Sequence, residues 1–310
     1  MKLADAVAQY VEHKQAMGVR FRTERRTLKS FCHGLGDTDL AQIGPDTVRS
    51  FLAGAGPVTR FWQRKHEVLL GFYRFVVARG YVTDSPLPRT VPKPSQQFVP
   101  YIFSLAELKR LLAATESCER SRGAMSAATC RTLLLLLYGT GLRIGEALSL
   151  TLADVDLEAA LLKVRESKFY KTRLVPIGPD LQVALSQYLA RRPDHPDADA
   201  RLIVSRTGTA VSRAAAEGAF RRLRHHAGVL RHDDARYQPR LHDLRHAFAV
   251  HRLVSWYRAG ADVQRLLPHL ATYLGHVHIA ATQRYLTLTP ELLGEASERF
   301  ERYAMGGHHD

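Results

Sequence analysis

The chain has 310 residues, and its 44 Lys and Arg outnumber its 30 Asp and Glu, which gives a formal net charge of +14 at neutral pH and a pI near 10.0. This length fits one large or two ordinary domains, and two is the better expectation. The charge favours a polyanionic partner, nucleic acid before a membrane surface. The longest aliphatic run, Leu133 to Leu137, is too short to span a membrane and predicts a buried helix.

The N-terminus and the cysteines indicate a cytoplasmic protein. Residues Met1 to Asp5 contain no apolar region of the kind that a signal peptide needs. The cysteines, Cys32, Cys118 and Cys130, have neither a paired framework nor the spacing of zinc ligands, so we expect them to be reduced thiols.

Residues 1–85 predict a small all-helical domain. Apolar residues at helical spacing indicate a first helix over residues 3–17 and a second helix that Thr23 can cap. Pro45 opens a short third helix, and a fourth extends from about Val58 to Arg79.

Basic residues gather on and between the first two predicted helices, at the start of the fourth, and again later in the chain. Any one of them is most simply part of a solvated face. As a group, in a chain of this charge, they predict contacts with the DNA backbone. The predicted contacts are Arg22, Arg25, Arg26, Lys29, Arg60, Arg64, Lys65, Lys171, Arg221 and Arg222.

A proline-rich segment over residues 86–100 marks the domain boundary. Proline continues neither a helix nor a central strand, so the segment predicts an extended linker. Its prolines are Pro86, Pro88, Pro92, Pro94 and Pro100.

Residues 101–289 predict a larger, mostly helical domain with a small sheet. Ser104 and Glu107 form a capping box at the start of a helix. Two aliphatic segments, Val155 to Val164 and Arg173 to Ile177, flank a turn and predict an antiparallel hairpin, and Leu202 to Val204 is a candidate extension of it. The predicted fold class is therefore mainly α, with a helical N-terminal domain and a C-terminal α+β domain.

A set of short motifs follows in order along this second domain. It resembles the catalytic set of the tyrosine recombinases, the phage integrase and Xer-like family, over about residues 100–290. The motifs are Thr140-Gly141-Leu142-Arg143-Ile144-Gly145-Glu146, then Lys168, His242-x-x-Arg245, Leu274-Gly275-His276 and Tyr285. The resemblance implies a catalytic domain here and a SAM-like core-binding domain at residues 1–85, which matches the family in size, helicity and position only.

The chemistry of phosphodiester exchange independently requires residues of these types. The extra negative charge of a phosphorane-like transition state must meet fixed donors. Arg143 and Arg245 fit this task because a guanidinium pairs bidentately with phosphate oxygens and keeps its charge. Cations beside a phosphate also favour the phenolate of Tyr285, which makes this residue the candidate nucleophile near neutral pH.

The resemblance implies the remaining steps. Attack by Tyr285 leaves a 3′-phosphotyrosyl link and a free 5′-hydroxyl, so that neither a metal nor another cofactor is needed. Lys168 is the implied general acid for the departing oxygen, and Lys171 competes with it for that role. His242 and His276 are implied to bind the phosphate or to assist proton transfer.

Other polar residues near the motifs have simpler interpretations. Tyr273 is expected to pack in the core, and His246 and His251 to be structural or at the surface. Glu146 and Asp243 are expected to brace helices. A cluster of histidines and aspartates has no recognised metal-ligand spacing and is expected to be a solvated loop. Its members are His225, His226, His232, Asp233 and Asp234.

Residues 290–310 predict a final amphipathic helix and a tail. The resemblance implies that this helix docks on a neighbouring protomer and that a tetramer exchanges strands of duplex DNA through a Holliday junction, in chromosome or plasmid resolution, integration or transposition. With two predicted domains and no additional N-terminal arm-binding domain, we expect a Xer-like or transposon-borne enzyme and not a lambda-type integrase. A partner recombinase or accessory protein is a further expectation. The alternatives are a type IB topoisomerase-like enzyme and a non-catalytic architectural DNA-binding protein.

Overall fold

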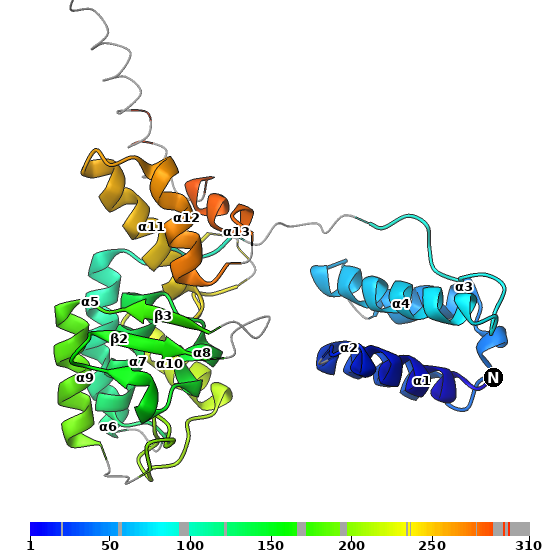
Figure 1. Cartoon of the computed structure of the whole chain (residues 1–310), viewed down its shortest axis with the longest axis horizontal. Coiled ribbons are helices and arrows are strands. Elements are labelled where there is room, and N and C mark those ends of the chain that lie inside the picture. The colour runs from blue at the N-terminus through cyan, green and yellow to red at the C-terminus, as the bar shows by residue number, and fades with distance from the viewer. Residues whose placement is uncertain are drawn as a thin grey trace, which may run out of the picture. The chain divides into compact units, whose positions relative to one another are not determined.

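The chain divides into two compact units, residues 1–98 and residues 99–310, which we call unit 1 and unit 2 (Figure 1). The structure is a computed structural model. It describes residues 1–19, 21–54, 58–92, 99–120, 123–165, 172–192, 197–233, 235, 237–276, 278–287, 294 and 297.

Unit 1 is all-helical. Its apolar core is built from one face of each helix and includes Tyr10, Phe31 and Phe72, each of which is almost fully buried. The helices are α1 (Leu3–Ala16), α2 (Arg22–Leu35), α3 (Pro45–Ala53) and α4 (Arg60–Ala78), with a short 3-10 turn, η1 (Leu40–Gln42).

The predicted cap of α2 is wrong. The helix begins at Arg22, before Thr23, and the residue that precedes it, Phe21, has a positive φ of 41°. Phe21 is buried, and its ring meets that of Tyr10 edge-on, with 5.4 Å between the centroids. Burial of an aromatic ring therefore fixes the start of this helix where a hydroxyl cap was expected.

Unit 2 combines helices with one small sheet, as the fold class predicted. Helices α11 (Asp243–Arg258), α12 (Val263–Leu274) and α13 (Ala280–Gln283) gather at one end of the unit, beside β3 (Figure 1). The remaining elements are α5 (Leu105–Ala113), η2 (Ala114–Glu116), α6 (Ser117–Arg120), α7 (Ala127–Thr140), α8 (Ile144–Ser149), η3 (Leu152–Asp154), β1 (Val155–Asp156), β2 (Leu161–Val164), β3 (Arg173–Pro176), α9 (Pro179–Arg191), α10 (Arg213–His226) and η4 (Arg284–Thr287).

Helix α7 is the centre of unit 2. It contains the aliphatic run from Leu133 to Leu137 and has buried residues on most of its circumference, as expected for a helix enclosed by others. It packs against α9 on one side and α11 on another. Its C-terminal end at Gly141 therefore lies where the motif residues of α8 and α11 can meet.

The sheet has three antiparallel strands in the order β1-β2-β3, and its details differ from the prediction. The expected first strand breaks into β1 and β2 at a turn that ends on Ala160, with a φ of 52°. Leu202 to Val204 adds no strand; Leu202 and Ile203 are buried in the core instead. Apolar segments of this length suit a buried loop as well as a strand, so periodicity did not separate the two.

Several predictions fall outside the described residues. Lys168 and Lys171 lie in the connection between β2 and β3, and the predicted final helix contributes only residues 294 and 297 to the description. Within the described residues, no helix is both long enough and apolar enough to cross a bilayer. The three cysteines are free thiols, and the sulfurs of Cys118 and Cys130 lie 2.8 Å apart in the core.

Candidate active site

Arg245 is the buried centre of the site. It projects from the first turn of α11, and only 2% of its surface is exposed. Its two terminal nitrogens donate hydrogen bonds to the backbone oxygens of Gly141, at 2.6 Å, and Leu274, at 2.7 Å. These carbonyls end α7 and α12, where the helix dipoles are negative, so the fold holds this guanidinium with two helix C-termini. Burial lowers the pKa of Arg245 to about 10.

Arg143 is held beside it by a carboxylate and a turn. One of its terminal nitrogens donates to Glu146, at 2.7 Å, and the other to the backbone oxygen of Gly275, at 3.1 Å. Its own backbone N–H donates to Glu146 at 3.0 Å, so this carboxylate also closes the N-terminus of α8. Arg143 is thus oriented from two sides while part of its side chain stays exposed.

Arg173, at the start of β3, completes this network and was not predicted. Its guanidinium donates to both oxygens of Glu146, at 3.2 and 2.9 Å, and to the backbone oxygen of Tyr273, at 3.1 Å. Burial alone would raise the pKa of Glu146, but the hydrogen bonds and charge of Arg173, with those of Arg143, lower it to about 2. The sequence offered one usable signal for Arg173, its place directly after the hairpin turn that carries Lys168.

The turn after α12 places His276. Gly275 ends the helix with a φ of 68°, a conformation that favours glycine, and a Cβ at this position would lie 2.8 Å from a terminal nitrogen of Arg173 and would displace that guanidinium. His276 follows, and its Nδ1 shares a hydrogen bond of 2.7 Å with the Thr282 hydroxyl. Burial and the nearby arginines lower the pKa of His276 to about 4, so the ring is neutral.

Tyr285 lies on η4 and is buried, with 3% of its surface exposed. Its ring is 6.2 Å from that of His276 and 5.5 Å from that of His246, between centroids. Burial raises the pKa of Tyr285 above its ordinary value, and the charge and hydrogen bond of Arg245 only partly offset this effect. In the DNA-free protein the arginines therefore do not outweigh burial, and the predicted effect of a bound phosphate on the phenolate stays a prediction.

His242, the residue that precedes α11, and His246, in the first turn of that helix, form a pair of rings. Their centroids are 4.9 Å apart and the rings are nearly perpendicular. Burial lowers the pKa of each to about 4. The prediction placed His242 in the site and left His246 structural or at the surface. The structure instead places His246 between His242 and Tyr285, a position that the four-residue spacing from His242 could have indicated.

Three residues near the site serve packing, as expected. The Tyr273 hydroxyl donates to the backbone oxygen of Pro176 at 3.0 Å, and its ring stacks on Phe248. His251 shares a hydrogen bond of 2.8 Å with the Tyr138 hydroxyl. Asp243 is buried and accepts hydrogen bonds from the backbone and guanidinium of Arg240, which braces the segment before α11.

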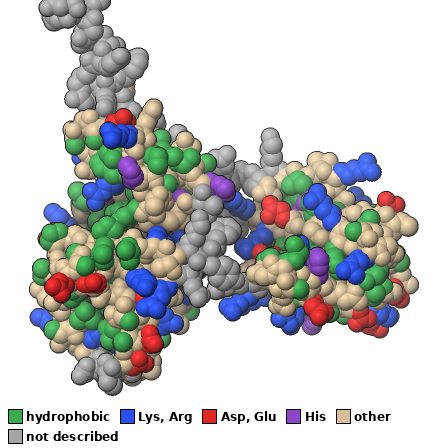
Figure 2. Space-filling view, viewed as in Figure 1, with side chains coloured by type: hydrophobic (Ala, Val, Ile, Leu, Met, Phe, Trp, Pro, Cys, Tyr) green, Lys and Arg blue, Asp and Glu red, His purple; other side chains and the backbone are tan. Residues whose placement is uncertain are grey.

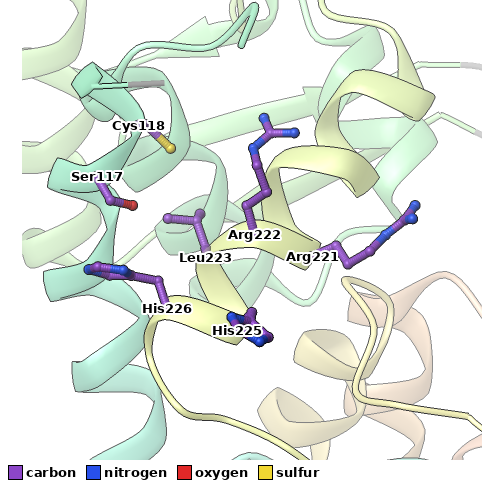
Figure 3. Close-up of a pocket in the computed structure, with 7 residues that line it drawn as sticks. All are labelled: Ser117, Cys118, Arg221, Arg222, Leu223, His225 and His226. Carbon is purple, nitrogen blue, oxygen red and sulfur yellow. The ribbon is translucent and has the colours of Figure 1, made fainter. Parts of the chain in front are cut away.

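Arg221 and Arg222 leave α10 in different directions (Figure 3). Both line a cavity of about 460 Å³ with Ser117, Cys118 and His226. Arg221 also lines a second cavity, of about 380 Å³, which reaches His242. A cation on α10 therefore borders the candidate active site. Among the described residues, no cluster of His, Cys, Asp or Glu has the arrangement of a metal site, His225 and His226 included.

The basic residues predicted to bind DNA in unit 1 divide into two groups. Four of them are exposed on one face of α2, which we call the α2 basic face: Arg22, Arg25, Arg26 and Lys29. Arg60 and Arg64 are exposed at the start of α4, whereas Lys65 is half-buried and donates to the backbone oxygen of Phe51 at 2.6 Å. On the face seen in Figure 2, the basic side chains of unit 1 are interspersed with acidic and apolar ones.

Comparisons with known proteins agree with this geometry. Residues 103–291 match the phage integrase family. A putative integrase/recombinase, y4rB, of Sinorhizobium fredii is 38% identical over 306 residues and covers 96% of each chain. The tyrosine recombinase XerD of Caulobacter vibrioides is 30% identical and covers 90% of this chain and 91% of the relative. A solved lambda integrase tetramer bound to a Holliday junction shares the fold, with a TM-score of 0.67 at 18% identity over 90% of this chain and 78% of that chain.

The fold, the site and these relatives define the class of protein as a tyrosine site-specific recombinase, an enzyme that acts on DNA. The chain belongs to the phage integrase family. The resemblance drawn from the motifs is thereby confirmed, and the topoisomerase-like and architectural alternatives are disfavoured.

Proposed function

We propose that this recombinase cleaves duplex DNA with Tyr285 and rejoins the strands in a new pairing through a Holliday junction. The observation that supports this mechanism is the convergence of Arg143, Arg245, His276 and Tyr285 around the turn at Gly275. Segments more than a hundred residues apart supply two fixed cations, a neutral imidazole and a phenol to one place, which is the set that phosphoryl transfer requires.

The reaction proceeds by transesterification. The Tyr285 oxygen bonds to phosphorus, the bond from phosphorus to the 5′-oxygen breaks, and that oxygen takes a proton from a general acid. Arg143 and Arg245 pair with the nonbridging oxygens and stabilise the extra negative charge of the transition state. His242 and His276, both neutral, hydrogen-bond the phosphate or assist proton transfer. The reaction conserves the phosphodiester bond energy in the phosphotyrosyl link, so it proceeds without ATP.

The tyrosine is tested by trapping. A nicked suicide duplex loses the short 5′-hydroxyl strand after cleavage, so a covalent protein–DNA adduct accumulates and is seen by denaturing electrophoresis. We expect the adduct in wild type and in Tyr273→Phe, the matched control on the neighbouring packed tyrosine, and none in Tyr285→Phe. An adduct that survives in Tyr285→Phe contradicts the mechanism.

The general acid is Lys168 in this proposal, with Lys171 as the competing candidate. A duplex with sulfur in place of the bridging 5′-oxygen separates them, because a thiolate leaves without a proton. Lys168→Met is expected to lower cleavage of the ordinary duplex by about 100-fold and to cleave the sulfur-containing duplex at nearly the wild-type rate. Rescue of Lys171→Met and not of Lys168→Met would assign the role to Lys171.

Strand exchange between two DNA sites requires an assembly of several protomers. Two protomers bind each of two sites and form a tetramer, the α2 basic face contacts the DNA backbone in unit 1, and Arg221 and Arg222 contact it in unit 2. The segment of residues 290–310 docks on the adjacent protomer. The protein acts in the cytoplasm, and its task is chromosome or plasmid resolution, phage integration or transposition.

A further inference from the structure

His246 lies on α11, one turn after His242, and its imidazole lies between two other rings of the site. Its centroid is 4.9 Å from that of His242 and 5.5 Å from that of Tyr285, to which it is inclined by 58°. The motif that predicted the site assigns no task to this residue. It is nevertheless the imidazole that α11 places against the candidate nucleophile.

The Nδ1 atom of His246 is buried and has no hydrogen-bond partner among the residues that the structure describes. Buried polar atoms are almost always paired, so an exception calls for an explanation. The other imidazole beside Tyr285 belongs to His276, whose Nδ1 is already bonded to the Thr282 hydroxyl. His246 and His276 both flank Tyr285, and the Nδ1 atom of His246 is the one still available as an acceptor.

Among the described residues, the charged groups with the largest electrostatic effect on His246 come from several elements and are all basic. They are Arg245 on α11, Arg240 before it, His276 after α12 and Arg284 on η4, and the ring of His242, the residue before α11, packs against that of His246. Burial and these groups lower the pKa of His246 to about 4, so the ring is neutral before DNA binds. A bound phosphate anion has the opposite effect and raises the affinity of the ring for a proton.

We propose that His246 is the proton acceptor for Tyr285, a catalytic role that rests on the function proposed above. When DNA binds, Nδ1 accepts a hydrogen bond from the Tyr285 hydroxyl. As the phenolic oxygen bonds to phosphorus, its O–H bond breaks and the proton moves to Nδ1. The bond from phosphorus to the 5′-oxygen breaks at the same time, and that oxygen receives a proton from the general acid. His242 packs edge-on against His246 and keeps its ring in place, and rejoining runs these transfers in reverse.

Single-turnover cleavage of the suicide duplex, with enzyme saturating over DNA, tests this role. His246→Phe keeps a ring and removes both nitrogens, and we expect its cleavage rate near neutral pH to fall by about 100-fold with DNA binding unchanged. His246→Asn keeps a hydrogen-bonding group but takes up no proton, so its rate is expected to fall by at least about 10-fold. Both rates should rise steadily toward pH 9, where the phenolate forms without a base, while the wild-type rate levels off. His251→Asn, on the same helix, is the matched control and should cleave like wild type.

A rate for either His246 variant within about threefold of wild type overturns the proposal, since a general base contributes far more than this. Rescue of His246→Phe by the duplex with a bridging 5′-sulfur also overturns it, because the defect would then lie on the side of the leaving group. If thermal unfolding shows that His246→Phe is misfolded, His246→Asn decides. If the adduct depends on Tyr285 and the His246 variants form it at the wild-type rate, only the role of His246 is overturned. If the wild-type protein forms no adduct, the proposed function is overturned as well.

Discussion

The cations at the centre of unit 2 are fixed by hydrogen bonds, whereas those on the surface of unit 1 are exposed to solvent. Arg245 is almost fully buried and is held by the carbonyls of Gly141 and Leu274, and Arg143 is held by Glu146 and Gly275. The α2 basic face lies in solvent along one side of its helix.

This difference indicates different tasks. A guanidinium fixed by backbone carbonyls does not reorganise when charge develops beside it, so it stabilises one geometry of the transition state. Exposed side chains adapt to any phosphate within reach, and salt screens them. We therefore expect unit 2 to determine the rate of cleavage and unit 1 to contribute mainly affinity.

The largest expected effect comes from replacing the buried cation. Arg245→Lys keeps the charge but cannot donate to Gly141 and Leu274 in the fork geometry of a guanidinium. We expect the cleavage rate of the suicide duplex to fall by at least about 1000-fold, and the free energy of unfolding to fall by roughly 2 kcal/mol, because two buried carbonyls lose a charged donor.

Arg252→Lys is the matched control for this change. Arg252 lies two turns further along α11, is exposed, and rests over the ring of Phe248. Its substitution should leave the cleavage rate unchanged and alter the free energy of unfolding by less than about 0.5 kcal/mol. Cleavage by Arg245→Lys at more than about a tenth of the wild-type rate would contradict the claim that the fixed guanidinium, unlike the exposed cations, determines the rate.

A smaller effect is expected on the α2 basic face. The double substitution Arg25→Gln/Arg26→Gln should weaken DNA binding by roughly 10-fold at moderate salt and reduce the slope of log affinity against log salt by about 2, because each phosphate that is no longer neutralised lowers the slope by about 0.9. The cleavage rate at saturating enzyme should not change. Band-shift titrations at several salt concentrations measure both quantities.

Arg49→Gln/Arg79→Gln removes the same charge from other exposed positions in unit 1. Arg49 pairs with Asp46, and Arg79 lies over the ring of Phe75. An equal loss of affinity in this control would show that net charge, and not the face of α2, determines binding by unit 1.

The smallest expected effect is on the pH dependence of stability. The pKa of each of His242, His246 and His276 is lowered to about 4 by burial, against roughly 6.5 in an unfolded chain. Between these values the unfolded chain binds more protons, so the free energy of unfolding falls as the pH falls from about 6.5 toward 4. Calorimetry should show a Tm at pH 5 that is at least about 5 °C below the Tm at pH 7, and a smaller difference in His246→Phe. Glu146, with a pKa of about 2, titrates below this window. A Tm that is constant between pH 7 and pH 5 contradicts the assignment of neutral, buried rings.

Most of the helices could be predicted because their signals are local. Pro45 opens α3, Ser104 and Glu107 cap α5, and the run of leucines forms α7. The errors occurred where contacts distant in sequence outweighed local preference. The ring of Tyr10 fixes Phe21 at the start of α2, and the core takes up Leu202 and Ile203 without pairing them to the sheet.

The sequence by itself determined the helical class, the family and the residue types of the site, because each motif is a short local string whose order is specific. Only the tertiary structure decided how those residues are held. The carbonyls that fix Arg245, the link from Arg173 to Glu146, and the place of His246 against Tyr285 all join segments distant in the chain. The net pKa of Tyr285 was decided there too, because burial is a property of the packed core and opposes the effect of the arginines that the sequence made visible.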